Sequence, residues 1–321
     1  MNIKRIVSVI SAVLLFAALL IYPQAASQAA LSGLKMCAQL ILPSLFPFFV
    51  ATTLLSELGV TRRLGKVFAP VCEKLFNVSG NGGTAFIIGI TAGYPLGAAY
   101  ISGMRKRNEI SKEEAERLLI FCNNSGPAFI IGAAGTGVFS SAAAGLFLYA
   151  IHIIAALAGG IIFAPKVCFV SDVKASDAGI PSFATALTNA VKSSVAACIS
   201  VSGFIVAFSV LTGILDYSGV FSSLIGFLSA SAGTELHWSR ALLCGIIELG
   251  NGIGSMSGLT AGPLSLALAA FILGWGGISV HFQTFAMLDG TDIKTARYII
   301  GRFVIALIGS ALALFGAILI F

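Results

Sequence analysis

Apolar residues run along the chain in long stretches that carry almost no charge. Many stretches approach 20 residues, the length with which an α-helix crosses the ~30 Å hydrocarbon core of a bilayer. They do not alternate with period two, as the strands of an outer-membrane barrel would. The pattern therefore predicts an all-α polytopic membrane protein, with apolar segments at residues 6–22, 36–57, 83–103, 117–135, 138–164, 190–215, 218–231, 240–260, 263–288 and 299–321.

Composition agrees with this class and removes others. Of the 321 residues, 57% are hydrophobic and 10% are charged, whereas roughly 25% of a typical soluble domain is charged. A soluble enzyme, a disordered chain, a coiled coil and a disulfide scaffold are excluded. Lysine and arginine number 19 against 13 acidic residues, a net charge of +6. These bases stand at the ends of apolar segments, where cytoplasmic loops collect them, so no nucleic-acid partner is expected.

The sequence offers no pattern for a metal, a cofactor or a catalytic centre. The loop GxxxxGK[ST] of ATP-driven pumps and the motifs GxSxG and HExxH do not occur. We therefore expect no enzyme activity, no cofactor and no metal site, and gradient-driven transport remains. The six cysteines lack a CxxC pair and are expected to pack as small hydrophobic residues: Cys37, Cys72, Cys122, Cys168, Cys198 and Cys244.

Basic residues predict an orientation in the membrane. Lys4 and Arg5 precede the first apolar run, which places the N-terminus in the cytoplasm. That run resembles a signal peptide, but its length and the membrane-embedded remainder favour an uncleaved first helix. Two crossings later the next basic group falls inside: Arg62, Arg63, Lys66 and Lys74. The same rule places a later group inside: Lys294, Arg297 and Arg302.

The segment 83–103 conflicts with this orientation if it crosses the membrane completely. It ends at the basic residues 105–107, which would then lie outside. Gly93 and Gly97 permit a tight reversal, and Pro95 cannot continue a helix. We therefore predict a re-entrant hairpin whose limbs each reach about half the membrane depth.

The second half repeats the order of the first. The Gly-rich stretch 245–254 corresponds to 89–97, and residues 271–277 correspond to 121–127 as a break inside an apolar helix. With 240–260 as a second re-entrant hairpin, entered from outside, the two halves acquire opposite orientations. This is the inverted-repeat architecture of secondary transporters, with interrupted helices around a midplane site.

These features divide the chain into four parts. Residues 1–80 form N-terminal membrane helices and a cytoplasmic amphipathic segment, and 81–164 form the first repeat. Residues 165–189 are expected to link it to the second, inverted repeat at 190–321. The lipid bilayer is the expected surrounding of both repeats, and the sequence carries no signal for an oligomeric state.

The strongest single feature is a polar run, residues 123–127, inside an apolar helix. Polar side chains at bilayer depth cost several kcal/mol unless they find partners. Gly126 and Pro127 end one half-helix and begin the next, whose N-terminus carries a partial positive charge. This arrangement suits a small anionic substrate, with Asn123, Asn124, Ser125 and Gly126 as binding residues. The alternative is a polar cluster that merely joins helices.

Glu248 is the carboxylate that lies well inside an apolar run. An ionisable residue at that depth indicates function by default. We expect Glu248, with Asn251 beside it, to couple transport to a proton or a sodium ion. The structural alternative pairs Glu248 with a helix terminus or with His281.

Residues of both halves complete the predicted substrate site. Two glycines interrupt the second broken helix, two aromatic side chains offer rings on which a planar ligand could stack, and two polar side chains follow the break. They are Tyr94, Trp275, Gly276, Gly277, His281 and Gln283. For His281, a hydrogen bond to a neighbouring helix is the structural alternative. His152 has no polar companion on its apolar helix and is expected to be a structural core residue.

Several of these motifs together resemble the sporulation integral membrane protein YlbJ family. The resemblance covers nearly the whole chain. It rests on Gly-Tyr-Pro-Leu-Gly at 93–97, the charged stretch 112–118, Phe-Cys-Asn-Asn-Ser-Gly-Pro at 121–127, Glu248, and Gly-Trp-Gly-Gly-Ile-Ser-Val-His at 274–281.

The resemblance implies a nucleoside-recognition, or Gate, domain and a fold similar to that of concentrative nucleoside transporters. It also implies a role in spore formation. Through the related SpoVV proteins, it implies export of dipicolinic acid from the mother cell across the outer forespore membrane. Two alternatives stay open: a nucleoside or other small-metabolite carrier, and a non-transporting membrane scaffold for sporulation.

Overall fold

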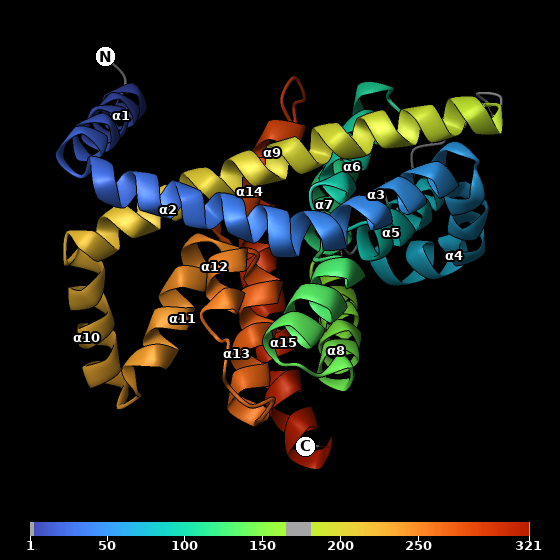
Figure 1. Ribbon diagram of the computed structural model, residues 1–321. Coiled ribbons are helices and arrows are strands. Elements are labelled where there is room, and N and C mark those ends of the chain that lie inside the picture. The colour runs from blue at the N-terminus through green and yellow to red at the C-terminus, as the bar shows by residue number, and fades with distance from the viewer. Residues whose placement is uncertain (1–2, 165–180, 321) are drawn as a thin grey trace.

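The computed structural model describes residues 3–164 and 181–320, and every regular element in these ranges is a helix (Figure 1). Most of the expected linker, including Cys168, lies outside the described residues. The elements are α1 (Ile3–Ile21), α2 (Pro23–Met36), η1 (Cys37–Ile41), α3 (Leu42–Glu57), α4 (Val60–Phe76), α5 (Gly80–Thr91), α6 (Leu96–Lys106), α7 (Lys112–Cys122), η2 (Ala128–Val138), α8 (Ala142–Ile162), α9 (Phe183–Tyr217), α10 (Val220–Ala232), α11 (Leu236–Ile247), α12 (Leu249–Gly254), α13 (Pro263–Trp275), α14 (Gly277–Met287) and α15 (Ala296–Ile320).

Five stretches of the described chain are helical, long and apolar enough to cross a bilayer. With the shorter apolar helices between them, they confirm the predicted all-α membrane class. The five are Pro23–Glu57, Ala142–Ile162, Phe183–Tyr217, Pro263–Met287 and Ala296–Ile320.

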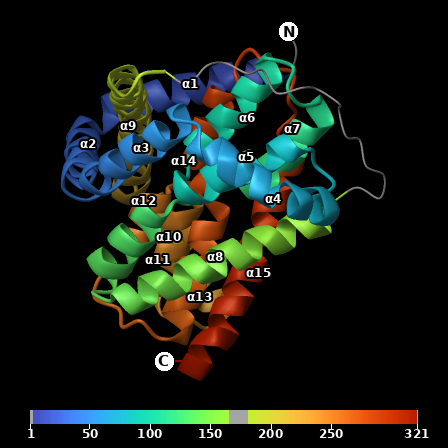
Figure 2. The ribbon, with the colours of Figure 1, turned by 90° about the vertical axis from the view of Figure 1, so that its right-hand side faces the viewer.

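Two helices of 35 residues each form one flank of the molecule, where α2 and α9 lie side by side (Figure 2). The first joins α2, η1 and α3 without interruption, and the second is α9. They run antiparallel. The Tyr22 ring meets the Tyr217 ring at 5.7 Å, and at the far end Asn189 Nδ2 donates to Glu57 Oε2 at 3.0 Å.

The sequence-based start of the first long helix at residue 36 is wrong. The helix begins at Pro23, whose fixed φ suits a first turn. The small residues before position 36 are helical because they allow close approach to α9. A methyl group at Gly33 would stand 3.0 Å from Ser209 Oγ, and one at Gly213 would overlap Ala29.

The order of elements is the same in the two halves. A long helix, a shorter helix, a helical hairpin, an interrupted helix and a final helix follow one another in each. The final helices, α8 and α15, are antiparallel because Gly159 lies against Ile305 and Phe147 against Gly316. Equivalent helices therefore run in opposite directions, as the inverted-repeat prediction requires. On this order we propose that each repeat begins with its long helix, and the expected boundary at residue 81 stays a prediction.

Helices α5 and α6 form the first hairpin, with its tip at residues 92–95. Each limb rises about 17 Å at 1.5 Å per residue, roughly half the hydrocarbon thickness. The open ends meet on one side, because Asn81 Nδ2 donates to the Glu109 carbonyl at 3.3 Å. Gly93 at the tip has φ of 77°, which favours glycine. The predicted re-entrant hairpin at 83–103 is confirmed.

The second hairpin consists of α11 and α12 and starts from the opposite end of the molecule, beside α10 and the first turn of α13 (Figure 1). Its limbs touch through backbone, since a methyl group at Gly252 would overlap Gly245. The two interrupted helices are also confirmed. The first breaks between α7 and η2 at residues 123–127, and the second breaks at Gly276, where φ is 85°.

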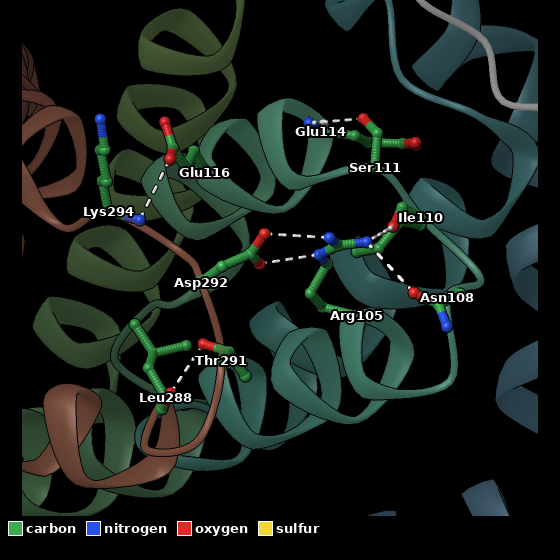
Figure 3. Close-up of polar contacts among 10 residues, drawn as sticks. All are labelled: Arg105, Asn108, Ile110, Ser111, Glu114, Glu116, Leu288, Thr291, Asp292 and Lys294. Carbon is green, nitrogen blue, oxygen red and sulfur yellow. Dashed lines mark hydrogen bonds and ion pairs between the residues drawn. The ribbon is translucent and has the colours of Figure 1, made fainter.

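A polar latch joins the end of the first hairpin to the loop before α15 (Figure 3). We use this name for Arg105, Asp292, Glu116 and Lys294. Arg105 donates from Nε and Nη2 to the two carboxylate oxygens of Asp292, at 2.9 and 3.0 Å. The backbone N–H of Lys294 donates to Glu116 Oε1 at 3.0 Å. The loop of residues 288–295 in the second half is thereby held against the first half.

We expect Arg105→Glu to release this loop, because it sets two carboxylates against each other. The hydrogen bond from Arg105 lowers the pKa of the Asp292 carboxyl. The attraction is therefore present above the ordinary aspartate pKa and is lost as the pH falls through the lowered value. Hydrogen exchange in residues 288–295 should rise a few-fold in the variant at neutral pH, and in the unaltered protein only in strong acid. The double variant Arg105→Asp with Asp292→Arg should restore protection. Unchanged exchange in Arg105→Glu would mean that the Glu116 bond alone holds the loop.

Candidate functional site

A cavity lies where both hairpins, both interrupted helices and both long helices converge. The empty space in and at the mouth of the cavity, open solvent included, is about 460 Å³. The long helices contribute aliphatic walls, and the hairpin tips and helix breaks contribute the polar groups. The residues that form it include Ile41, Leu45, Ala92, Tyr94, Ser125, Gly126, Val201, Ile205, Glu248, Leu249, Gly250, Val280 and Gln283.

Asn123 lies behind the cavity wall, fully buried, and its amide joins three elements. Its Oδ1 accepts the backbone N–H of Ala98 on α6 at 3.2 Å. Its Nδ2 donates to Thr284 Oγ1 on α14 at 2.9 Å and to the Tyr298 hydroxyl on α15 at 3.3 Å. The side chain thus ties the first hairpin to both neighbouring helices of the second half.

Asn124 is also fully buried and is bonded to a guanidinium. Its Oδ1 accepts from Arg302 Nη1 at 2.9 Å, and its Nδ2 donates to the Phe121 carbonyl at 2.6 Å. Arg302 Nη2 donates to the Tyr94 hydroxyl at 2.7 Å, and that hydroxyl donates onward to the Leu273 carbonyl at 3.2 Å. Tyr94, which lines the cavity, is therefore held from behind by a buried cation.

The sequence-based placement of Arg302 in the cytoplasm is wrong. Its side chain has no exposed surface and lies inside the helix bundle, on the face of α15 that meets the first break. The positive-inside rule counted it with Lys294 and Arg297 because it follows Arg297 closely in the sequence. The hydrophobic run around it, residues 299–321, is the signal that would have indicated a membrane-embedded arginine.

Ser125 and Gly126 line the cavity at the first break. The backbone N–H of Ser125 donates to His152 Nε2 on α8 at 3.1 Å. His152 therefore has the polar companion that its apolar helix did not reveal, and it plays a structural part by satisfying a backbone donor that the break leaves free. The Ser125 hydroxyl lies 3.5 Å from the Leu273 carbonyl.

Glu248 occupies the turn between the limbs of the second hairpin and lines the cavity. Its Oε2 accepts the backbone N–H of Asn251 at 2.6 Å, which caps α12. Of the two structural alternatives, the helix terminus is the partner, while His281 bonds elsewhere. Asn251 does not line the cavity, and its Nδ2 donates to Ser209 Oγ on α9 at 3.0 Å.

Of the predicted residues at and after the second break, one side chain lines the cavity and the others bond to neighbouring helices. Gln283 lines the cavity and donates to Ser279 Oγ at 3.3 Å. Trp275 donates from Nε1 to the Ile246 carbonyl at 3.1 Å and so fastens the second hairpin to the break. Its ring meets the His281 ring edge-on at 4.3 Å. His281 Nδ1 lies 3.2 Å from the Tyr298 hydroxyl.

Five of the predicted site residues meet at the cavity, namely Tyr94, Ser125, Gly126, Glu248 and Gln283. The other predicted site residues do not line it: Asn123, Asn124, Asn251, Trp275, Gly276, Gly277 and His281. Both glycines of the second break have positive φ, and Gly277 approaches the Leu249 amide of the second hairpin. A role in substrate binding stays a prediction for every residue of both groups.

Comparison with known proteins gives the family. The Gate family model, described as nucleoside recognition, matches residues 38–164. The sporulation integral membrane protein YlbJ of Bacillus subtilis (strain 168) is 32% identical over 331 residues, which cover 94% of this chain and 81% of that protein. The chain belongs to the YlbJ family. YlbJ proteins are integral membrane proteins of sporulation, and the apolar helices agree with that assignment.

Solved structures show which fold this YlbJ-family chain has. It resembles CNTnw in an inward-facing substrate-bound state with a TM-score of 0.53 at 15% identity, covering 97% of this chain and 86% of the other. A single-residue variant of CNTnw in an intermediate state gives a TM-score of 0.54 at 14% identity, with 97% and 85% covered. The fold is therefore similar to that of a concentrative nucleoside transporter, as the family resemblance implied.

Proposed function

We propose that this protein is a secondary transporter of a small organic anion, and that the anion is dipicolinate, exported across the outer forespore membrane during sporulation. The observation that carries the proposal is the buried cation behind the cavity. Arg302 is fully buried, and both hydrogen-bond partners that it has within residues 3–164 and 181–320, Asn124 and Tyr94, are neutral. A buried cation without a bonded carboxylate favours an anion nearby.

The cavity adds groups that suit a planar anion. Tyr94 separates the cavity from Arg302 and presents an aromatic ring against which a planar ligand can stack. Ser125 and Gly126 stand where η2 begins, and a helix N-terminus favours negative charge. Dipicolinate, a planar aromatic ring with two carboxylates, matches these three features.

Glu248 faces the same cavity and would repel an anion while it is charged. A proton or a sodium ion bound with the substrate removes that repulsion. We therefore propose Glu248 as the coupling group. We also propose the orientation that the basic residues favour, in which the N-terminus and residues 105–107 lie on the cytoplasmic side. Coupling and substrate binding then meet in one cavity.

A nucleoside carrier is the second candidate, favoured by the nucleoside-recognition family model and by the CNTnw fold. In that case the cavity amide and hydroxyl of Gln283 and Ser125 would bond to ribose or base. A non-transporting scaffold for sporulation is the third candidate. It requires no ligand in the cavity.

Counterflow in proteoliposomes distinguishes the three candidates without knowledge of the coupling ion. Vesicles loaded with unlabelled dipicolinate should accumulate labelled dipicolinate several-fold above empty vesicles, and external nucleosides should not compete. Gln283→Ala should weaken apparent affinity about five-fold, the effect of about 1 kcal/mol for one lost hydrogen bond. Gln39→Ala, at an exposed position on the first long helix, is the matched control and should transport normally.

Each alternative has its own result in this assay. Counterflow of labelled nucleoside into nucleoside-loaded vesicles, with none of labelled dipicolinate into dipicolinate-loaded vesicles, would establish the nucleoside carrier. Absence of counterflow for both ligands, in protein that is inserted and monodisperse, would support the scaffold. Equal loss in Gln283→Ala and Gln39→Ala would remove the cavity from the transport path.

A further inference from the structure

Helix α4 presents three distinct faces along its 17 residues. The first face is buried against the first hairpin. Gly65 meets Thr84 of α5 so closely that no side chain fits between the two helices. Cys72 and Phe76 continue this face and are each 1% exposed. The helix is thus fastened to α5 over its length.

The second face is apolar and uncovered. Its five residues recur at helical spacing and form one stripe: Leu64, Val67, Phe68, Val71 and Leu75, exposed by 45%, 71%, 40%, 49% and 43%. Soluble surfaces rarely leave so continuous an apolar patch in water. The helix is too short and too charged to cross a bilayer, so this face does not belong to a membrane span.

The third face is basic and borders the stripe. Arg63, Lys66 and Lys74 are exposed, and Glu73 is the acidic residue among them. On a helical wheel Arg63 and Lys74 stand directly beside Val67. A helix with one apolar face and one basic face lies in the membrane interface, with the apolar residues at the acyl chains and the bases among the headgroups.

We propose that α4 lies in the interface of an anionic leaflet and binds acidic phospholipid headgroups through Arg63, Lys66 and Lys74. The charge of the helix favours this occupant over a second copy of the chain. Two copies meeting through this stripe would bring two basic faces together. The opposite face is fixed to α5 by backbone contact at Gly65, so bound lipid also sets the depth of the first hairpin. The proposal does not depend on what the cavity transports.

The test measures which lipid surrounds α4. The full-length protein, with its native cysteines replaced by alanine, carries a bimane label at Val67→Cys. It is reconstituted into equimolar phosphatidylglycerol and phosphatidylcholine vesicles, with an acyl-chain nitroxide on one lipid or on the other. The measured quantity is the ratio of quenching by labelled phosphatidylglycerol to quenching by labelled phosphatidylcholine. At low salt this ratio should be about five-fold higher at Val67 than at a reference position on an uncharged helix.

Phe227→Cys on α10 supplies that reference. Phe227 is 69% exposed, close to the 71% of Val67, and α10 carries no charged residue in Val220–Ala232. The preference at Val67 should fall to the reference value in the variant Arg63→Gln, Lys66→Gln, Lys74→Gln, and also in high salt. Equal ratios at the two positions would overturn the proposal. So would the failure of both lipids to quench at Val67, which would mean that protein covers the stripe.

Discussion

Arg302→Gln is expected to lower the apparent affinity for dipicolinate about 10- to 100-fold, the effect of about 1.5–3 kcal/mol for interactions with a charged group. The buried guanidinium donates at 2.7 Å to the hydroxyl of Tyr94, and Tyr94 lines the cavity. Equilibrium binding and counterflow in proteoliposomes measure the change. Arg297→Gln, on the exposed side of the same helix, should behave as the unaltered protein.

A second variant separates charge from packing, because Arg302→Gln alone could also disturb the fold. Asn124→Asp keeps the shape of the side chain, gives up the hydrogen bond to the Phe121 carbonyl and places a carboxylate against Arg302, so the cation is neutralised in place. We expect this variant to insert and remain monodisperse but to lose anion binding to a similar degree. Unchanged dipicolinate binding in Asn124→Asp would contradict a role for the Arg302 charge and leave it a structural group.

Glu248→Gln is expected to retain substrate binding and to lose gradient-driven accumulation. The amide keeps the size of the side chain and can still accept the Asn251 N–H with its oxygen, but it cannot carry a proton. Counterflow, which needs no gradient, should continue, while uptake driven by an imposed pH gradient should fall to the level of empty vesicles. The pH dependence of transport should disappear as well.

Glu235→Gln provides the matched control for this measurement, because Glu235 is exposed at the start of the same hairpin. It should accumulate substrate normally. If Glu248→Gln also accumulates substrate under a pH gradient, a proton on Glu248 is not the coupling ion. A sodium gradient imposed on the same vesicles then tests whether Glu248 takes part in sodium coupling.

The sequence predicted the irregular parts of this fold better than the regular ones. Gly93, Pro95 and the run at 123–127 break helices for local reasons that residue types reveal directly. The basic groups before and after the hairpin, at 62–74 and 105–107, must both lie inside, so the hairpin has to return to its starting side. These arguments need no tertiary contact, so they hold before any packing is known.

The parts that depended on partners were not predicted. Ala29 and Gly33 read as a weakly apolar stretch, and only contact with α9 explains why they continue the first long helix. Arg302 and His152 lie far along the chain from the groups that they bond, so spacing gave no indication of either interaction. The cavity-lining set was predicted in part, because break and polarity coincide there. Predicted residues that do not line the cavity, such as Asn123 and Asn124, form hydrogen bonds to side chains of the second half.

The first hairpin and the first break meet at several points through backbone, and this limits how the protein can move. A methyl group at Gly89 or Gly97 would overlap the Cys122 carbonyl, and the Tyr94 N–H donates to the Asn124 carbonyl at 2.8 Å. At these three points backbone meets backbone, so no change of rotamer there lets one element slide past the other. The hairpin and the broken helix therefore travel as one rigid piece. We propose that access to the cavity alternates by displacement of that piece against the long helices, and not by a flap that opens at the hairpin tip.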